Sequence, residues 1–455
     1  MANSPGESSR PSRRHFLQTS SAALAAASLT SLAQPVHAAG DETLRIALVG
    51  CGNRGTGAAA NALQTAGPLK LWAMADAFED RLAGSLGILQ KGGRASGGAV
   101  PTSVAKRVDV PKDRQFVGLD AYRQAIDACD VVLICAPPGF RADHFEYAVA
   151  QGKHVFMEKP VATDPAGVRR VLAAAKAARD KDLKVGVGLQ RHHDVKYRET
   201  IQRLQDGAIG DLHTLRAYWN GGTIKRPVDR ADLTEMQYQV RNWYFFTWLS
   251  GDHIVEQHVH NLDVCNWLMN GHPVSAVGMG GRLMRTGKDY GDIFDHHAVE
   301  YTYADGTKMF GYCRQMPGCE PLVGEFATGT RGTADVGKYR IEAGDNAWHY
   351  PRTRRNRGSK YAADSPYQVE HDVLFAAIRS GTPHNEAETG AEATMTAILG
   401  RMATYTGRTV TWDEGFASQC VLTPETMAGW DTAPRKLPDS DGLYRLPMPG
   451  IDREV

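Results

Sequence analysis

The chain has 455 residues, 42% of them hydrophobic, and its 52 lysines and arginines nearly balance 51 aspartates and glutamates. A formal net charge of +1 argues against a nucleic-acid-binding protein that works through a basic surface. The length leaves room for two domains of ordinary size, and no segment beyond the N-terminal region is long and apolar enough to cross a membrane.

The N-terminal region matches the pattern of a twin-arginine export signal. Residues Ser12 to Leu17, "SRRHFL", place two arginines before a Phe-Leu pair, and a short apolar stretch from Ser20 to Leu32 follows. Small residues at Val36 and Ala38 predict cleavage after Ala38, so we expect residues 1–38 to be a signal peptide. The twin-arginine export machinery carries folded proteins, which predicts a periplasmic protein without a membrane span after cleavage. A disordered Ser/Arg-rich tail or an uncleaved anchor is the alternative.

A glycine-rich turn follows the first predicted strand of the mature chain. An apolar run from Leu44 to Val49 leads into Gly50-x-Gly52-x-x-Gly55 and then into an alanine-rich helix. In a dinucleotide-binding fold the first glycine allows the tight turn, the second lets the backbone approach a pyrophosphate, and the third lets helix and strand pack closely. The start of the helix then presents free N–H groups to the phosphates.

The second predicted strand ends in Asp76, 21 residues beyond Gly55. A carboxylate at this position accepts hydrogen bonds from the ribose hydroxyls of the adenosine. An acid there repels a 2′-phosphate, so the sequence favours NAD, while the nearby Arg81 keeps NADP open.

Strands and helices continue to alternate, which predicts an α/β fold with a doubly wound parallel sheet of the Rossmann type over residues 41–190. Further strands are expected over residues 130–138, 154–160 and 183–190, and helices over residues 144–152 and 164–180. The segment 91–107 is rich in Gly, Ser and Ala, and we expect it to be a long loop.

Ligands of such sheets bind beyond the carboxyl ends of the strands. This rule places five residues along one rim, near the nicotinamide: Pro137, Glu158, Lys159, Pro160 and Gln190.

Six motifs occur in order along the chain: "GCGNRG", "APP", "MEKP", "GLQRHH", "GDHIVEQHVHNLDVCNW" and "GRMATYTGRTVTWDE". With them the chain resembles the glucose–fructose oxidoreductase, inositol dehydrogenase and rhizopine-catabolism (Gfo/Idh/MocA) family over nearly its whole mature length. The resemblance implies an NAD-binding Rossmann domain followed, over residues 191–455, by an α+β domain. That second domain would carry a large, mainly antiparallel open sheet, bind the substrate and mediate homo-oligomerisation.

The resemblance also implies roles for individual residues. Lys159 is expected to point at the substrate hydroxyl that is oxidised, with Glu158 beside the cofactor. The cofactor site as a whole is assigned to Gly50, Gly52, Asn53, Arg54, Gly55, Asp76, Pro137, Glu158, Lys159 and Gln190.

The family usually shows an acid, three intervening residues, a histidine, two more residues and an Asp, which here gives Glu256, His260 and Asp263. Two departures are Glu256, where Asp is usual, and His258, where a small residue is commoner. Residues four apart share a helix face, so Glu256 would fix or assist His260. When a C–H bond gives up a hydride, the hydroxyl on that carbon must lose its proton. We expect His260 to be the base and Lys159 to stabilise the alkoxide.

Other polar residues are candidates for the substrate pocket, with solvent-facing positions as the alternative: Arg191, His192, His193, Asp263, Asp295 and His296. Residues 292–312 alternate like a half-buried strand, an "ADG" turn and a partner strand. His253, Glu256, His258 and His260 crowd together, but no third ligand follows in a metal-binding signature, so we expect no metal.

The seven cysteines are scattered and odd in number, which does not make a disulfide framework. Cys313 and Cys319 could pair, but a chain that folds in the reducing cytoplasm gains little from bridges, so we expect buried thiols. The aromatic and basic stretches 219–230 and 241–251 suit either a sugar face or a dimer contact through the open sheet.

Outside the cytoplasm there is no free nicotinamide pool, so an exported Rossmann protein must hold its dinucleotide tightly and recycle it in place. We therefore predict an oxidoreductase that transfers hydride between a held cofactor and a ring hydroxyl of a sugar, glycoside or cyclitol. One alternative is a redox-neutral glycosidase, similar to N-acetylgalactosaminidases, that oxidises C3 transiently. Others are a non-catalytic NAD- or sugar-binding protein and a cytoplasmic dehydrogenase with a spurious signal.

Overall fold

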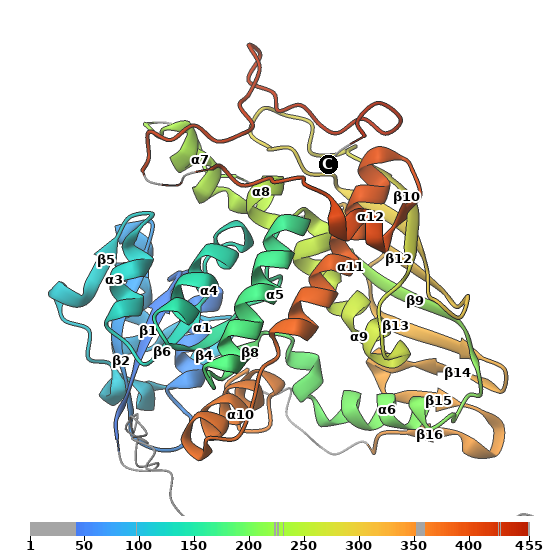
Figure 1. Ribbon diagram of the computed structural model, residues 1–455, viewed down its shortest axis with the longest axis horizontal. Coiled ribbons are helices and arrows are strands. Elements are labelled where there is room, and N and C mark those ends of the chain that lie inside the picture. The colour runs from blue at the N-terminus through green and yellow to red at the C-terminus, as the bar shows by residue number, and fades with distance from the viewer. Residues whose placement is uncertain are drawn as a thin grey trace, which may run out of the picture. The chain divides into compact units, whose positions relative to one another are not determined.

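In the computed structural model, the glycine-rich turn joins a central strand of a six-stranded sheet to the helix that follows it (Figure 1). The structure describes residues 42–96, 98–222, 224, 227–230, 232–351, 360–425, 427 and 429–453. The predicted signal peptide, residues 1–38, lies outside the described residues. Within these described ranges, the length and apolarity needed for a transmembrane helix are not reached anywhere.

All neighbouring strands of this first sheet are parallel, in the order β5-β2-β1-β6-β7-β8. The strands are β1 (Leu44–Val49), β2 (Leu69–Asp76), β5 (Gln115–Val117), β6 (Val131–Ile134), β7 (His154–Met157) and β8 (Val185–Val187). Short apolar runs suit strands that are covered on both faces, and every residue of β6 is buried. The predicted Rossmann-type parallel sheet is confirmed.

Helices cover both faces of the first sheet. One face carries α3 (Ala121–Asp127), α4 (Arg141–Ala150) and α5 (Pro165–Asp180). The other face carries α1 (Asn53–Ala62), α2 (Glu79–Lys91) and α10 (Pro366–Ser380). Helix α10 comes from the part of the sequence that we assigned to the second domain, and its Leu374 and Phe375 are buried in the core of the first.

The expected long loop over residues 91–107 is wrong. Two short antiparallel strands, β3 (Gly93–Ala95) and β4 (Gly98–Val100), are followed by a 3₁₀ helix, Thr102–Arg107. The many small residues led us to predict a loop, but three apolar side chains of this segment, Ala95, Val100 and Val104, are buried in the core shared with α1 and α2. Burial of these side chains orders the segment.

The second domain is built on a nine-stranded sheet in the order β16-β15-β14-β13-β9-β12-β11-β10-β17. Every neighbouring pair is antiparallel except β9 and β12. The strands are β9 (Leu212–Gly221), β10 (Ser275–Gly281), β11 (His296–Thr302), β12 (Lys308–Gln315), β13 (Leu322–Gly329), β14 (Gly332–Asp335), β15 (Arg340–Glu342), β16 (Trp348–His349) and β17 (Val410–Thr411). The predicted, mainly antiparallel sheet and its β11–β12 hairpin are confirmed.

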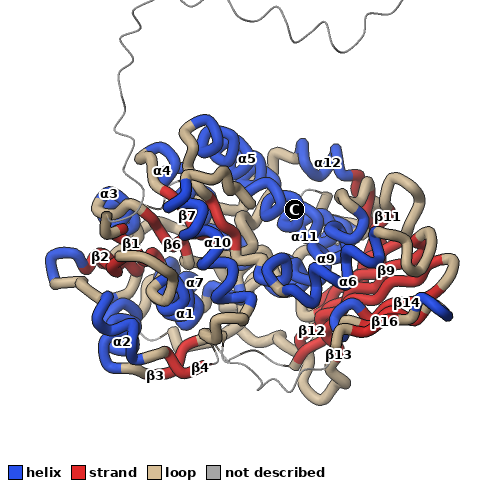
Figure 2. The backbone as a smooth tube through the Cα atoms, turned by 90° about the horizontal axis from the view of Figure 1, so that it is seen from below, coloured by secondary structure: helices blue, strands red, loops and turns tan. Residues whose placement is uncertain are grey.

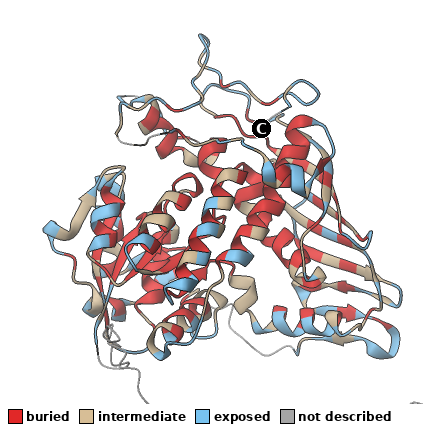
Figure 3. Cartoon of the chain, in the orientation of Figure 1, coloured by how far each residue is buried: buried red, intermediate tan, exposed pale blue. Residues whose placement is uncertain are grey.

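Helices α6 (Val195–Gln205), α9 (Val259–Met269) and α11 (Ala387–Thr406) lie on one side of this sheet (Figure 2). The strands on the other side carry partly exposed and exposed residues (Figure 3), among them Val277, Met279, Tyr312 and Leu322. An apolar, uncovered sheet face of this kind is typical of an interface.

The remaining helices lie where the two domains meet. They are α7 (Glu235–Arg241), α8 (Thr247–Ser250), a π-helix (Ile254–His258) that leads into α9, and α12 (Trp412–Ala417). The C-terminal segment, red in Figure 1, crosses over α7 and α8, and its Trp430 and Tyr444 join the aromatic core there.

All seven cysteines are free. Cys51, Cys129, Cys265 and Cys313 are buried, as expected, but Cys319 is exposed. The interpretation of all cysteines as buried thiols is therefore wrong for Cys319, which lies in a turn after β12, while Cys135 and Cys420 are only partly buried.

Candidate active site

A cleft of about 760 Å³ runs along the carboxyl ends of β1, β2, β6, β7 and β8 and is closed from the other side by the second domain. Its residues form two groups. Asp76, Phe78 and Arg81 lie at one end, and Glu158, Lys159 and His260 line the cleft as well. By the rule for parallel sheets, this is the position of a dinucleotide.

The glycine turn has the geometry that a pyrophosphate needs. Gly50 has a φ of +94°, and a Cβ there would lie 2.4 Å from the nitrogen of Ala136. A Cβ on Gly52 would meet no atom within 4 Å, so the space over this residue is open to a ligand. Gly52 also begins α1 without a side-chain cap, which leaves the first N–H groups of the helix for anionic oxygens. The turn therefore fits the phosphates of NAD.

Asp76 lies at the end of β2 and lines the cleft. Its carboxylate accepts hydrogen bonds from the backbone nitrogens of Cys51, at 2.6 Å, and Phe78, at 2.9 Å. Burial raises the pKa of Asp76, although these two hydrogen bonds act in the opposite direction. The two N–H groups hold the carboxylate in place where ribose hydroxyls would meet it. Arg81 lines the same end of the cleft.

An inter-domain clasp lies at the same end and consists of Arg241, Asp80, Phe78 and Trp430. Arg241 of α7 makes two hydrogen bonds, of 2.7 and 2.8 Å, to the carboxylate of Asp80 on α2. Its guanidinium lies 3.9 Å from the ring centre of Phe78, which stacks on Trp430 with 5.1 Å between centroids. Sequence reasoning missed this clasp, because nothing local in "YQVRNWYFF" shows that it meets α2.

Arg54 of the glycine turn lies between two carboxylates. It donates to Glu158, which follows β7, and at 3.2 Å to Glu370 of α10. Burial alone would lower the pKa of Arg54, but Glu158 and Glu370 raise it above its ordinary value. One further guanidinium nitrogen, Nη1, is buried without a partner among the described residues. A buried donor in this position fits an anionic or hydroxyl oxygen of the cofactor. Glu370 was not predicted.

Lys159 and Glu256 meet at the centre of the cleft. The Lys159 ammonium donates to the backbone carbonyl of Glu256 and lies 3.2 Å from its carboxylate, while Gln257 donates to the other carboxylate oxygen. Burial raises the pKa of Glu256, and the Lys159 charge opposes that shift. The peptide bond between Lys159 and Pro160 is cis.

His260 lines the cleft beside this pair. Its ring stacks on Trp219 with 5.9 Å between centroids, and its backbone carbonyl accepts a 2.8 Å hydrogen bond from Arg191. Burial, together with Lys159 and Arg191, lowers the pKa of His260 well below its ordinary value. The imidazole is therefore neutral near neutral pH and can accept a proton. No other described side chain hydrogen-bonds its ring nitrogens.

Two more residues of the cleft are Lys360, which lies before α10, and Tyr367, which lies in the first turn of α10. The Lys360 ammonium lies 4.3 Å from the ring centre of Tyr367, and the Tyr367 hydroxyl accepts a 3.3 Å hydrogen bond from Gln190. Burial and the neighbouring Arg54 lower the pKa of Lys360. Both residues line the cleft, and neither stands in a motif that sequence analysis could use.

The other predicted cofactor residues, Asn53, Gly55 and Pro137, also line the cleft. The six predicted substrate residues do not line it. Arg191 pairs with Glu325 beneath His260, His192 with Asp263 at 2.9 Å, and His193 with Glu386 at 2.9 Å.

Asp295 accepts two backbone N–H groups, of Leu283 and Met284, and His296 lies beside it on the open side of the second sheet, with its side chain 41% exposed. The sequence pattern identified polar residues close to the motifs, but these side chains are occupied by partners inside the second domain. His258 likewise bonds the Ala217 carbonyl, at 3.1 Å, away from the cleft. Among the residues that the structure describes, no three metal-ligating side chains come together.

Two family models match successive parts of the chain. Residues 44–188 match the model described as "Oxidoreductase family, NAD-binding Rossmann fold", and residues 197–334 match the "GFO/IDH/MocA C-terminal domain". The chain belongs to the Gfo/Idh/MocA family of oxidoreductases. Its first domain is the NAD-binding Rossmann domain of that family, and the expectation from the sequence motifs is confirmed at this level.

Curated Gfo/Idh/MocA relatives include two named inositol 2-dehydrogenase. The one from Rhizobium meliloti is 28% identical over 181 residues, 40% of this chain and 48% of the relative. The one from Gluconacetobacter diazotrophicus is 33% identical over 159 residues, 34% of this chain and 41% of the relative. The match thus spans less than half the length of either relative.

Solved structures share the fold over a larger part of the chain. An aldose-aldose oxidoreductase from Caulobacter crescentus, complexed with glycerol, aligns with 81% of this chain and 100% of its own, at 18% identity and a TM-score of 0.60. A levoglucosan dehydrogenase in complex with NADH and levoglucosan aligns with 81% of this chain and 99% of its own, at 16% identity and a TM-score of 0.61.

Proposed function

We propose that this protein is an NAD-dependent oxidoreductase that acts on a ring hydroxyl of a sugar, glycoside or cyclitol. The observation that carries the proposal is the meeting of Lys159, Glu256 and His260 in the same cleft as the glycine turn and Asp76. The names of the relatives, inositol and carbohydrate oxidoreductases, support a polyhydroxylated substrate.

A nicotinamide ring supplies a hydride acceptor when it is bound in such a cleft. The residues of this chain perform the proton chemistry. The neutral His260 imidazole accepts the hydroxyl proton at a ring nitrogen, because its low pKa keeps it unprotonated. The Lys159 ammonium stabilises the negative charge on the oxygen, and Glu256 holds that ammonium from behind through two acceptor atoms. Glu158 and Glu370 hold Arg54 at the cofactor.

Three further features belong to the proposal. The clasp at the adenosine end supports a dinucleotide that stays with the protein, which suits a periplasmic enzyme exported in the folded state by the twin-arginine machinery. Asp76 supports NAD over NADP. The open face of the second sheet, with Val277, Met279, Tyr312 and Leu322, supports homo-oligomerisation through that face.

The test begins with mature protein isolated from the periplasm. It is denatured, and the released nucleotide is identified by mass spectrometry; we expect NAD close to one per chain. The intact protein is then incubated with a panel of inositols, aldoses and glycosides, and the absorbance of reduced nicotinamide is followed. Protein that contains no nucleotide and takes up neither NAD nor NADP would refute the proposal.

The same protein is then incubated with glycosides in deuterated water. One outcome is release of the aglycone together with incorporation of deuterium at C2 of the sugar, without net reduction of the cofactor. That outcome would replace the dehydrogenase assignment by the redox-neutral glycosidase. Oxidation of one sugar coupled to reduction of a second, without such exchange, would support the oxidoreductase.

A further inference from the structure

The segment that presents Glu256 is not a regular α-helix. Residues Ile254–His258 form a π-helix that continues into α9. A π-turn closes over one residue more than an α-turn, and such turns occur frequently at functional sites. Here Glu256, Gln257 and His260 all line the cleft, and both the carbonyl and the carboxylate of Glu256 face Lys159. The path of this one turn therefore decides where the lysine is held.

Asp252 starts the turn from an unusual backbone conformation. Its φ is +78°, directly after Gly251 at +79°, so two consecutive residues occupy the left-handed region. A non-glycine residue persists there only when its surroundings hold it. The Asp252 carbonyl accepts the N–H groups of Val255, at 3.1 Å, and Glu256, at 2.9 Å. The orientation of Asp252 thus sets the first turn of the π-helix directly.

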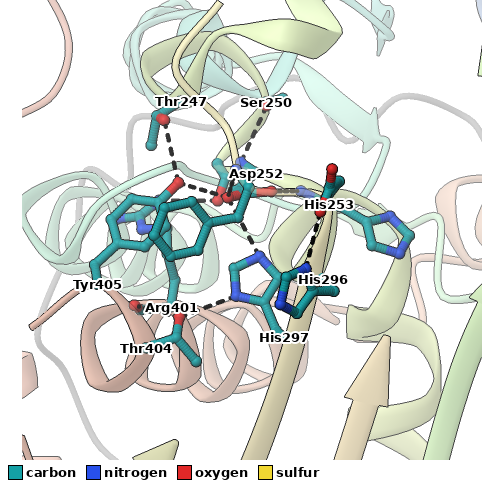
Figure 4. A network of polar contacts seen from close by, with 12 residues as sticks. Thr247, Ser250, Asp252, His253, His296, His297, Arg401, Thr404 and Tyr405 are labelled. Atoms are coloured by element: carbon teal, nitrogen blue, oxygen red, sulfur yellow. Dashed lines mark hydrogen bonds and ion pairs between the residues drawn. The ribbon is translucent and has the colours of Figure 1, made fainter. Parts of the chain in front are cut away.

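The carboxylate of Asp252 is fully buried and is surrounded by partners (Figure 4). One oxygen accepts from the Tyr405 hydroxyl and from the backbone N–H of Phe294, at 2.9 Å, and lies 3.3 Å from Nε2 of His297. The other oxygen accepts from the backbone N–H of His253. These contacts tie Asp252 to β11 and to α11 at once.

Further hydrogen bonds hold the residues around Asp252 in place. His297 shares a 2.9 Å hydrogen bond with the Thr404 hydroxyl, and the buried Arg401 donates to the carbonyls of Gly251, at 3.0 Å, and Thr163, at 2.7 Å. Burial would raise the pKa of Asp252, but His297, Tyr405 and the Phe294 N–H lower it to about 2. The group is an anion at all pH values at which the protein would work.

We propose that Asp252, His297 and Tyr405 are positioning residues that fix the π-turn and through it hold the Lys159 ammonium at the reaction centre. None of the three lines the cleft. They act on Lys159 through Glu256, whose backbone N–H bonds the Asp252 carbonyl and whose own carbonyl and carboxylate contact the lysine. The consequence for turnover rests on the proposed function, whereas the placement of the lysine does not.

The test measures the accessibility of Lys159 to a small amine reagent. Mature protein is treated with an acetylating N-hydroxysuccinimide ester, and acetylation of each lysine is quantified by peptide mass spectrometry. Tyr405→Phe removes one hydroxyl from the network, and Asp252→Asn removes its charge while keeping a residue that tolerates the left-handed region. Lys184, with its side chain 2% exposed, is the internal control for general loosening. Tyr303→Phe is the matched control variant, because it removes a buried 2.8 Å hydrogen bond to Asn266 elsewhere in the same domain.

We expect both network variants to raise the acetylation rate of Lys159 by about tenfold, the factor that one lost buried hydrogen bond provides, without a change at Lys184. The Tyr303→Phe variant should leave Lys159 unchanged. Equal rises at Lys159 and Lys184, or an unchanged Lys159 in both network variants, would overturn the proposal. The nucleotide content of each sample is measured alongside. A wild-type protein without nucleotide would defeat the proposed function, while the acetylation pattern would still decide the positioning role.

Discussion

Arg241 and Asp80 form a two-point ion pair between the second domain and the Rossmann domain, with N–O distances of 2.7 and 2.8 Å. The pair lies over the adenosine end of the cleft, next to the side chain of Phe78. Because Arg241 and Phe78 line this end of the cleft, we expect the contact to slow the release of a dinucleotide. The clasp therefore connects the geometry of the site to the retention of the cofactor.

Breaking the clasp should speed nucleotide release. The Asp80 side chain is 60% exposed, and an ion pair of this exposure contributes at most about 1 kcal/mol, so we expect Arg241→Asp to raise the dissociation rate about fivefold. Adding Asp80→Arg to that variant restores the pair with reversed charges and should slow release again. Glu79→Ala is the matched control, since Glu79 pairs with Lys112 within the first domain. Stopped-flow displacement of the nucleotide measures the rates; equal rates in all four proteins would show that the clasp does not retain it.

Loss of either proton-handling residue should stop turnover without emptying the cleft. For Lys159→Ala and His260→Ala we expect kcat to fall by a factor of about 10² to 10⁴, because one removes the cation and the other the base. Lys176→Ala serves as the control, since Lys176 pairs with Asp180 on the surface of α5. Turnover with the best substrate of the panel and the nucleotide content after gel filtration are measured together. Full activity in either site variant would refute its assigned role.

Two glycines of the turn should respond differently to alanine. Gly52 has an ordinary φ of −71° and open space beyond it, so Gly52→Ala should fold normally but weaken nucleotide binding by about tenfold or more. In Gly55→Ala the new Cβ would lie 1.9 Å from the Gly50 carbonyl oxygen, and we expect a lower melting temperature. Gly84→Ala, on the open side of α2, should leave nucleotide binding unchanged and should not lower the melting temperature, because alanine favours a helix interior more than glycine does. Normal nucleotide affinity in Gly52→Ala would remove the pyrophosphate from this turn.

The carboxylate of Asp76 should decide between the two dinucleotides. Asp76→Ala removes the acceptor for ribose hydroxyls and the repulsion of a 2′-phosphate, so we expect weaker NAD binding and a smaller preference over NADP. Dissociation constants for both nucleotides, measured by calorimetry on stripped protein, give the ratio. An unchanged ratio and affinity would separate Asp76 from the cofactor site.

Acid should destabilise the protein through its buried histidines. Burial lowers the pKa values of His144, His253, His258 and His371 to about 3. In the unfolded chain these groups titrate near 6.5, so between about pH 6.5 and 3 the unfolded state binds more protons and stability falls as the pH decreases. Each such histidine removes up to about 1.4 kcal/mol per pH unit in that window. The free energy of unfolding is measured by denaturant titration at several pH values between about 7 and 5.

A variant isolates one of these groups. His144 stacks on Tyr122 with 4.1 Å between centroids and has a buried ring nitrogen without a partner among the described residues. His144→Phe keeps a neutral ring there and should flatten the pH dependence, whereas a change at the exposed His213 should not. A stability that does not vary with pH in the wild-type protein would contradict the neutral, buried state of these histidines.

Elements and site residues that depend on local sequence patterns could be predicted. The strands at residues 44–49 and 69–76 lie where the apolar runs predict them, because buried parallel strands need continuous apolar side chains. Lys159, Glu256 and His260 stand in motifs and do meet in one cleft. The π-helix at Ile254–His258 could not be predicted, because a helical spacing does not show where one extra residue enters a turn.

The remaining site residues come from contacts over long distances in the chain. Glu370 and Arg54 are 316 residues apart in the sequence, and no sequence pattern near either residue predicts that they pair. For Asp295 and His296 the sequence predicted the position in the fold but not the role. Alternation placed them correctly on a strand and its flank, but alternation does not show which neighbouring loop satisfies a carboxylate.

Helix α10 has a consequence for the order in which the protein is made. It covers one face of the Rossmann sheet and brings Glu370 to Arg54, yet it begins only at Pro366. Domains that are continuous in sequence can fold as the ribosome delivers them. Here the first domain remains without one of its covering helices until more than three-quarters of the chain has been synthesised. A nascent chain that lacks α10 does not have the complete nucleotide pocket, so we expect loading with dinucleotide to follow the translation of α10.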